Sequence, residues 1–198
     1  MKARLFLYLV AMILAGVLAL PAFGQNPFVK TLGGNDWDIG HSVIEASDGG
    51  LVVTGETYSY GAGNFDLLLA KFDGSGTPLW TKTLGGTDDD RGQVVTEVSD
   101  GGFVVIGGTQ SYGAGDWDLF LSKFDGSGNH LWTKTLGGTG HDRGYVVTEV
   151  SDGGLLLQER RTVTAQEIMI SFWPSSMVRG TIFGRKLLGE AAMMLDLP

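Results

Sequence analysis

Short apolar or alternating stretches, separated by glycine-rich turns, fill most of the chain after Gly24. Residues 93–98 are rich in β-branched side chains and end in the turn sequence Ser-Asp-Gly-Gly. Residues 103–106 form a short apolar run, which is typical of a strand covered on both faces. Residues 118–124 lead into the turn Asp-Gly-Ser-Gly, and residues 130–136 alternate in character before a Gly-Gly pair. This pattern predicts four consecutive strands joined by tight turns.

The four-strand pattern recurs with a period of 52 residues. The string Trp-Thr-Lys-Thr-Leu-Gly-Gly begins at Trp80 and again at Trp132, and a copy with Phe-Val in place of Trp-Thr begins at Phe28. Four strands in about 50 residues, repeated in tandem, are typical of a β-propeller blade. Solenoid coils are usually shorter, and sandwich domains need more residues per unit. We therefore predict an all-β chain that forms a partial β-propeller of four-stranded blades.

The copy at residues 28–34 carries the motif of a blade's fourth strand. A lone strand at the start of an array can complete the last blade and close the ring, which removes an exposed sheet edge. We expect residues 28–34 to form such a strand.

The N-terminal segment has the three regions of an export signal. Lys2 and Arg4 precede an apolar run over residues 5–20, and residues 22–24 fit a small-x-small cleavage site before Gln25. The run is shorter than the roughly 20 residues that a membrane-spanning helix needs. We predict a signal peptide over residues 1–24, no membrane span after its cleavage, and a secreted, periplasmic or cell-surface protein.

The repeat stops after Leu157, and residues 158–198 contain no Asp-Gly turn. A C-terminal extension is one interpretation. The genetic code favours another: one nucleotide restored before the codon of Gln158 lets the tail be read as a further copy of the repeat. Met and Trp each have a single codon that ends in G, so some positions of that second frame are forced. In the second frame the forced positions give the residues that the repeat has one or two periods earlier. The codon at Ile170 becomes Asp, as at Asp118; that at Pro174 becomes Ala, as at Ala70; that at Val178 becomes Gly, as at Gly126; and that at Met194 becomes Asp, as at Asp142.

We therefore interpret residues 158–198 as a frameshifted, non-native tail and not as a domain. Residues 25–157 then contain about two and a half blades of a longer array. A closed propeller needs at least four blades, so we expect a truncated chain with exposed strand edges.

Composition narrows the possible functions. The net charge of -8 argues against nucleic-acid binding, which requires clustered Lys and Arg. The absence of Cys excludes disulfides and cysteine-based zinc sites. The three histidines, His41, His130 and His141, lack the spacing of metal ligands and are expected to be ordinary strand or surface residues.

Acidic residues cluster in the expected loops. They are Asp36, Asp38, Asp88, Asp89, Asp90, Asp116, Asp118 and Asp142. Such oxygen-rich loops can hold Ca²⁺, so a calcium site is one hypothesis, although no complete calcium-binding loop motif is present. The alternative is that Asp stabilises turns by accepting hydrogen bonds from nearby backbone amides. No cofactor is predicted, and no metal ligands are assigned.

No unique polar constellation points to catalysis. Most of these acids have acidic counterparts in the other copies, whereas an active site usually breaks the symmetry of a repeat. Trp80 and Trp132 recur at one position, which favours packing between blades over ligand stacking. We predict no catalytic residues, and whether the intact protein is an enzyme stays open, with a non-enzymatic role favoured.

The strings Asp-Gly-Gly-(Leu/Phe)-Val-Val, Ser-Tyr-Gly-Ala-Gly, Lys-Phe-Asp-Gly-Ser-Gly and Thr-Lys-Thr-Leu-Gly-Gly, found between Phe28 and Leu157, resemble tandem repeats of uncharacterised secreted bacterial and archaeal β-propeller proteins. The segment from Lys123 to Trp132 is also similar to a turn of quinoprotein propellers. The resemblance implies a propeller fold and an exported location. The expected function is a binding or structural surface module for a protein or glycan; the alternatives are a fragment of a quinoprotein- or glycan-lyase-like enzyme, or a calcium-stabilised adhesin segment.

Overall fold

The computed structural model describes residues 28–162, 166–173 and 185–187, with side chains as far as residue 158. Twelve strands and no helix occur in these ranges, so the prediction of an all-β chain is confirmed. Residues 1–24, the predicted signal peptide, lie outside them. Within the described part of the chain, no helix long and apolar enough to cross a membrane is found.

The first sheet is a four-stranded antiparallel meander. It consists of β1 (Asp38–Glu45), β2 (Leu51–Thr57), β3 (Asp66–Phe72) and β4 (Pro78–Leu84), which lie side by side in chain order. The Ser-Asp-Gly-Gly turn joins β1 to β2, and Gly49 takes a φ of 78° there, a backbone conformation that favours glycine.

The second sheet repeats this arrangement. It consists of β5 (Asp90–Glu97), β6 (Phe103–Thr109), β7 (Asp118–Phe124) and β8 (His130–Leu136), again in chain order. Each strand begins exactly one repeat period after its counterpart in the first sheet. The four strands expected from the hydrophobic pattern are therefore present: β7 and β8 have the expected bounds, and β5 and β6 begin or end slightly away from theirs.

The third sheet consists of β9 (His141–Glu149), β10 (Leu155–Thr162), β11 (Gln166–Trp173) and β12 (Arg185–Leu187). Strand β10 runs without interruption through the point at which the tail was expected to begin. Strand β11 begins at residue 166, whereas the repeat period of β3 and β7 would place its start at residue 170. The remainder of the expected tail, residues 163–165, 174–184 and 188–198, lies outside the described residues.

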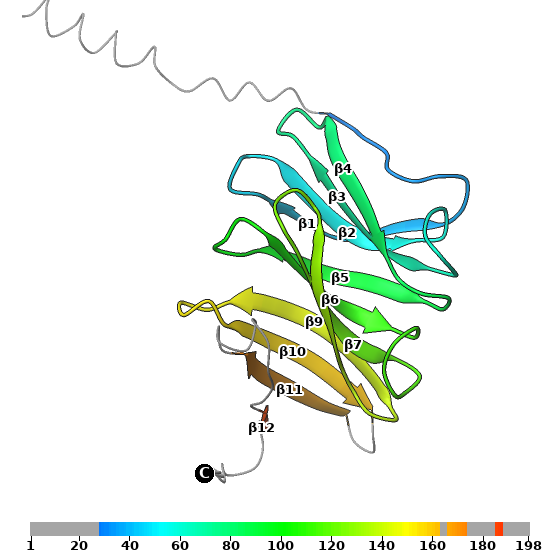
Figure 1. Cartoon of the computed structure of the whole chain (residues 1–198), viewed down its shortest axis with the longest axis vertical. Coiled ribbons are helices and arrows are strands. Elements are labelled where there is room, and N and C mark those ends of the chain that lie inside the picture. The colour runs from blue at the N-terminus through cyan, green and yellow to red at the C-terminus, as the bar shows by residue number, and fades with distance from the viewer. Residues whose placement is uncertain (1–27, 163–165, 174–184, 188–198) are drawn as a thin grey trace, which may run out of the picture.

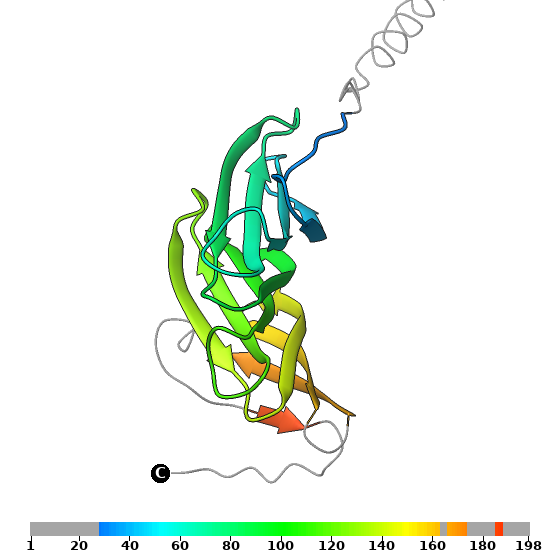
Figure 2. The same ribbon diagram turned by 90° about the vertical axis from the view of Figure 1, so that its right-hand side faces the viewer.

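The three sheets lie one above another along the long axis of the molecule (Figure 1), and Figure 2 shows the same stack from the side. Two apolar clusters hold the stack together. The first lies between the first and second sheets and includes Val52, Leu67, Val95 and Phe120. The second lies between the second and third sheets, and its buried members are Val98, Val104, Ile106, Leu119, Leu121, Val147, Leu155 and Leu157.

Strand alternation explains why one sheet serves both clusters. Successive side chains of a strand point to opposite faces, so Val105 faces the first sheet while Val104 and Ile106 face the third. Both faces of β6 and β7 are buried, which accounts for the continuous apolar runs in their sequences. The packing expected of the tryptophans is also observed: Trp80 lies 6.0 Å from Phe103 between the ring centroids.

The strand expected at residues 28–34 is not formed. A strand needs a neighbour for its backbone hydrogen bonds, and no described strand lies beside this segment in a ladder. Its end is held by other contacts: the Gly34 amide donates to the Asp38 carboxylate at 2.7 Å, and the Tyr60 hydroxyl donates to the Gly33 carbonyl at 3.0 Å.

Candidate functional site at the loop end of the stacked sheets

Aspartates gather along the edge of the stacked sheets at which the first and third strands of each sheet begin. Asp66 and Asp118 open β3 and β7, and Asp90 opens β5. All three side chains are buried, with 1 to 2% of their surface exposed. Buried carboxylates require hydrogen-bond donors, and the loops of this end supply them.

Asp90 ties the loops of the second sheet together. Its Oδ2 accepts hydrogen bonds from the Gly86 amide at 2.8 Å and from the Ser111 hydroxyl at 2.6 Å. In the first sheet Asp38 makes the equivalent contacts, and Ser59 donates to it at 2.8 Å. Burial alone would raise the pKa of Asp38, but hydrogen bonds from Thr57, Gly34 and Ser59 outweigh burial and lower it.

Asp66 and Asp90 bring two carboxyl groups together between the first and second sheets. A Cβ atom on Gly85 would overlap with Oδ1 of Asp66 and would lie 2.8 Å from Oδ2 of Asp90. Oδ1 of Asp66 is buried without a hydrogen-bond partner among the described residues. Burial raises the pKa of Asp66, the amides of Ala62 and Gly63 oppose the rise, and the charge of Asp90 adds to it.

The guanidinium group of Arg91 lies between the first two sheets, near the buried aspartates. The Nε atom of Arg91 is 2.8 Å from a carboxylate oxygen of Glu56, which is 3% exposed, and its Nη2 is 2.8 Å from Asp89. The guanidinium also lies over the rings of Phe65 and Trp117, 5.5 and 4.9 Å from their centroids. Arg91, on β5, therefore contacts β2 of the first sheet. It also contacts the residues that come just before β3 and β7, the third strands of the two sheets.

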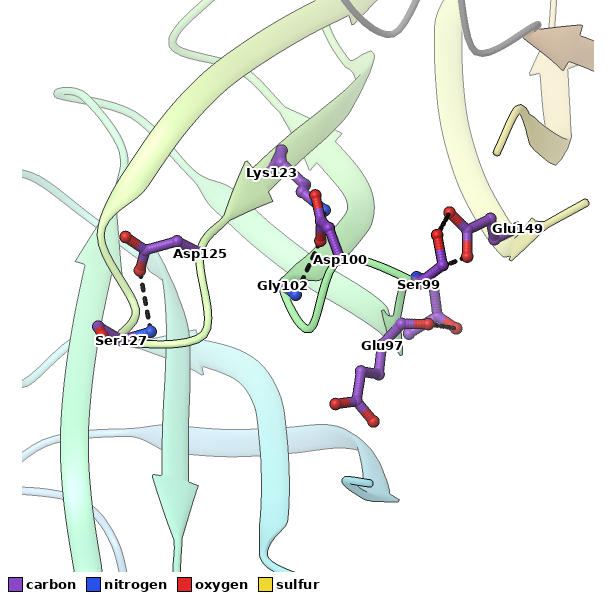
Figure 3. Close-up of polar contacts among 9 residues, drawn as sticks. Glu97, Ser99, Asp100, Gly102, Lys123, Asp125, Ser127 and Glu149 are labelled. Atoms are coloured by element: carbon purple, nitrogen blue, oxygen red, sulfur yellow. Dashed lines mark hydrogen bonds and ion pairs between the residues drawn. The ribbon is translucent and has the colours of Figure 1, made fainter. Parts of the chain in front are cut away.

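A serine–glutamate contact links neighbouring sheets at the opposite end of the strands. The amide and hydroxyl of Ser99, in the β5–β6 turn, donate to the two oxygens of Glu149 on β9 at 2.7 and 2.8 Å (Figure 3). The amide and hydroxyl of Ser47 donate to Glu97 in the same way, both at 2.7 Å. Each contact satisfies a turn amide and fixes the position of one sheet against the next.

Lysine–aspartate pairs brace the same turns. Lys123 donates to Asp100 at 2.7 Å (Figure 3), and Lys71 donates to Asp48 at 2.6 Å. Burial alone would raise the pKa of Asp100, but the hydrogen bonds from Lys123 and Gly102 lower it. Both lysines are buried, so each pair covers a sheet core and neutralises the charge that it buries.

Turn stabilisation also explains the aspartates of the Asp-Gly-Ser-Gly turns. Asp125 accepts the Ser127 and Asn129 amides at 2.9 and 2.8 Å, and Figure 3 shows the first of these contacts. The hydrogen bonds of Asn129 and Ser127 hold the pKa of Asp125 below its usual value. Asp73 makes the same contacts with the amides of Ser75 and Thr77. The carboxylates of these turns thus act as amide acceptors in both repeats.

A metal centre is not assembled in the part of the chain that the structure describes, since no group of three or more His, Asp or Glu side chains converges there. The three histidines lie apart from one another. His41 is 3.6 Å from Glu56, His141 is 3.3 Å from Asp116, and His130 is hydrogen-bonded to the Thr133 hydroxyl at 2.8 Å.

A groove of about 370 Å³ opens between β4 and the second sheet. Its lining combines aromatic rings, hydroxyl groups and one carboxylate: Leu84, Gly85, Asp90, Thr109, Tyr112, Phe120, His130, Thr133 and Thr135. Sheet packing explains its position. Thr133 and Thr135 lie on the side of β8 opposite to Trp132 and Leu136, which pack toward the third sheet.

The sequence contained a signal for some of these contacts and not for others. Glu45, Glu97 and Glu149 occupy one position in the three copies, shortly before the serine of each turn, so the inter-sheet contact was open to prediction. Arg91 has no counterpart in the first copy, where Ile39 stands, and its partners come from another sheet. The groove depends on the spacing of two sheets, which no local pattern encodes.

No protein-family model matches the chain. The regulatory protein FlaEY of Caulobacter vibrioides is 28% identical to it, over 74% of this chain and 18% of that protein. The chain therefore spans less than a fifth of the length of this relative. A similarity of this extent does not assign the chain to a family.

Proposed function

We propose that the chain is part of an exported β-propeller-type repeat protein that acts as a binding or structural surface module. Two features support this interpretation: the N-terminal sequence has the three regions of a secretion signal, and four-stranded antiparallel sheets stack face to face with a regular spacing of their strands. Stacked repeats of this kind present loops and grooves at regular intervals, which suits recognition of an extended ligand.

The groove between β4 and the second sheet is the observation that carries the binding proposal. Tyr112 and Phe120 supply aromatic surface, while Thr133 and Thr135 supply hydroxyl groups. A sugar ring has an apolar face and a polar rim, so this combination suits a glycan better than a charged ligand. The Tyr112 hydroxyl donates to the Gly85 carbonyl at 3.0 Å, which holds the ring at the groove.

Binding of the purified full chain to an array of bacterial surface polysaccharides tests the proposal. A Thr133→Trp substitution fills the groove and should weaken binding to any polysaccharide retained by the wild type at least tenfold. Thr81→Trp is the matched control, because Thr81 is the counterpart of Thr133 in the first sheet and does not line the groove. Equal affinities of the two variants would rule out the groove, and no retained polysaccharide would refute the glycan class.

Export is tested separately by fractionation of cells that express the full chain. The proposal expects a product outside the cytoplasm that has lost residues 1–24, with mass spectrometry placing Gln25 at its N-terminus. An uncleaved cytoplasmic product would contradict the exported location and leave the groove proposal to its own test.

A further inference from the structure

The outer face of the first sheet exposes side chains whose counterparts are buried in the other two sheets. Val43 on β1 is 62% exposed, whereas Val95 on β5 is 2% exposed and Val147 on β9 is 4% exposed. The difference follows from packing, since β5 and β9 each lie on a preceding sheet and β1 does not. Gly40 shows the same effect: a Cβ there would meet only Val53, while one on its counterpart Gly92 would overlap with Thr54.

The outer face of the first sheet also carries a carboxylate, that of Glu45, which lacks, within the described ranges, the hydrogen bonds that its counterparts accept. Glu97 and Glu149 each receive two hydrogen bonds from the serine of the preceding sheet's turn. Glu45 is their counterpart, is exposed, and receives no such bond from any described residue. The first sheet therefore presents an apolar patch with a carboxylate at the position that meets a serine turn elsewhere in the stack.

The outer face of the third sheet presents groups that are complementary to those of the first sheet. Val146 is 43% exposed and Leu156 is half-buried, although their counterparts in the second sheet, Val94 and Val104, pack against a following sheet. Ser151 occupies the position of Ser47 and Ser99 and is exposed. The third sheet thus offers apolar side chains and a serine turn that has no glutamate partner among the described residues.

We propose that the chain associates head-to-tail with a second copy of itself, with the first sheet of one copy packed on the third sheet of the other. The relation is the one already seen twice within the molecule, in which an apolar face and a glutamate meet an apolar face and a serine turn. The two faces lie at opposite ends of the stack (Figure 1), so the contact is heterologous, and its repetition extends the stack or closes it into a ring. Higher concentration should therefore add copies to the assembly up to the point at which a ring closes.

A two-fold pairing of two first sheets is disfavoured by the same residues. It would leave Glu45 of each copy without a serine turn as donor, because Ser47 of the first sheet already donates to Glu97 and Ser151 belongs to the third sheet. The head-to-tail contact supplies Ser151 as the donor to Glu45. This inference does not depend on the groove or on its ligand.

Sedimentation velocity of the full chain tests the proposal. Val43→Asp alters only the first-sheet end and Leu156→Asp only the third-sheet end, and each should raise the dissociation constant of self-association at least tenfold. An equimolar mixture of the two variants should still form a 1:1 complex and nothing larger, because each retains one intact end. Leu79→Asp is the control: Leu79 is 55% exposed on the first sheet, and its counterpart Leu131 stays 54% exposed within the stack.

A second readout keeps the test independent of changes to the apolar faces. The chain contains no cysteine, so Glu45→Cys and Ser151→Cys can be introduced into separate chains. A short thiol-specific bifunctional reagent should join the two kinds of chain to each other, and should join neither kind to itself. A wild type that stays monomeric at all accessible concentrations would overturn the proposal, as would loss of assembly in Val43→Asp with none in Leu156→Asp.

Discussion

The sharpest test of the stacked arrangement compares one substitution at two equivalent positions. Val95 and Val43 lie one repeat period apart, at the same place in the first strand of their sheets. Val95 is 2% exposed in the cluster between the first two sheets, whereas Val43 is 62% exposed. Val→Ala at both positions changes the same atoms in the same local sequence pattern, so only the neighbouring sheet distinguishes them.

The structure sets the size of the difference. Val95→Ala removes two buried methyl groups, which costs about 1.6 kcal/mol at about 0.8 kcal/mol each. Incomplete collapse of the cavity adds up to about 1 kcal/mol, so a total of roughly 2–3 kcal/mol is expected. Val43→Ala removes the same groups from a surface that water already reaches, and its cost should stay within about 0.5 kcal/mol.

Equilibrium urea unfolding, followed by tryptophan fluorescence, measures both costs. The experiment is run at high dilution, because association through the first sheet would stabilise the chain and cover Val43. A drop in the urea midpoint for Val95→Ala, with no change for Val43→Ala, is the expected result. Equal costs at the two positions would refute the packing of the second sheet on the first.

Three further outcomes follow from the same contacts. Glu149→Ala should destabilise the full chain by about 0.5–1.5 kcal/mol in urea unfolding, because two hydrogen bonds from an exposed turn are lost; an unchanged midpoint would show that the contact is unimportant. Asp66 has a raised pKa in the folded state, so its stabilising contribution is complete below its unfolded pKa and is lost as the pH rises through the folded value. Asp66→Asn should therefore gain stability relative to the wild type as the pH rises above about 4, the unfolded pKa of Asp, and a constant difference would contradict the burial of this carboxyl. Gly107→Ala should cost about 1–3 kcal/mol, since its Cβ would overlap with a carbonyl oxygen of the neighbouring strand, whereas Gly138→Ala, with open space around it, should be nearly neutral in the same assay.

Local pattern was enough to predict the strands of the first two sheets. Turn glycines, β-branched runs and alternation are properties of neighbouring residues, so they indicate where β5 to β8 begin and end. The segment at residues 28–34 shows the limit of this reasoning. It has the motif of a strand, but a strand forms only beside a partner, and the motif does not contain the partner.

The candidate site was harder to predict because its contacts join different sheets. The acidic loops suggested either calcium or turn stabilisation, and the observed acceptor roles of Asp90 and Asp118 correspond to the second interpretation. The pairing of Asp66 with Asp90 depends on how the first sheet meets the second, which neither strand's own sequence encodes. Repeat position alone would have indicated the partner of Glu149, since three equivalent glutamates precede three equivalent serine turns.

Cross-linking within a single chain tests the central claim, which is that successive repeats stack in chain order through one recurring contact. Cysteines are placed at Ser99 and Glu149, whose side chains meet between the second and third sheets. The control pair is Ser47 and Glu149, which belong to sheets that are not neighbours. At high dilution, a short bifunctional thiol reagent should join the first pair within the chain and leave the control pair open. Equal reaction of both pairs, or reaction of the control pair alone, would contradict the stacked order.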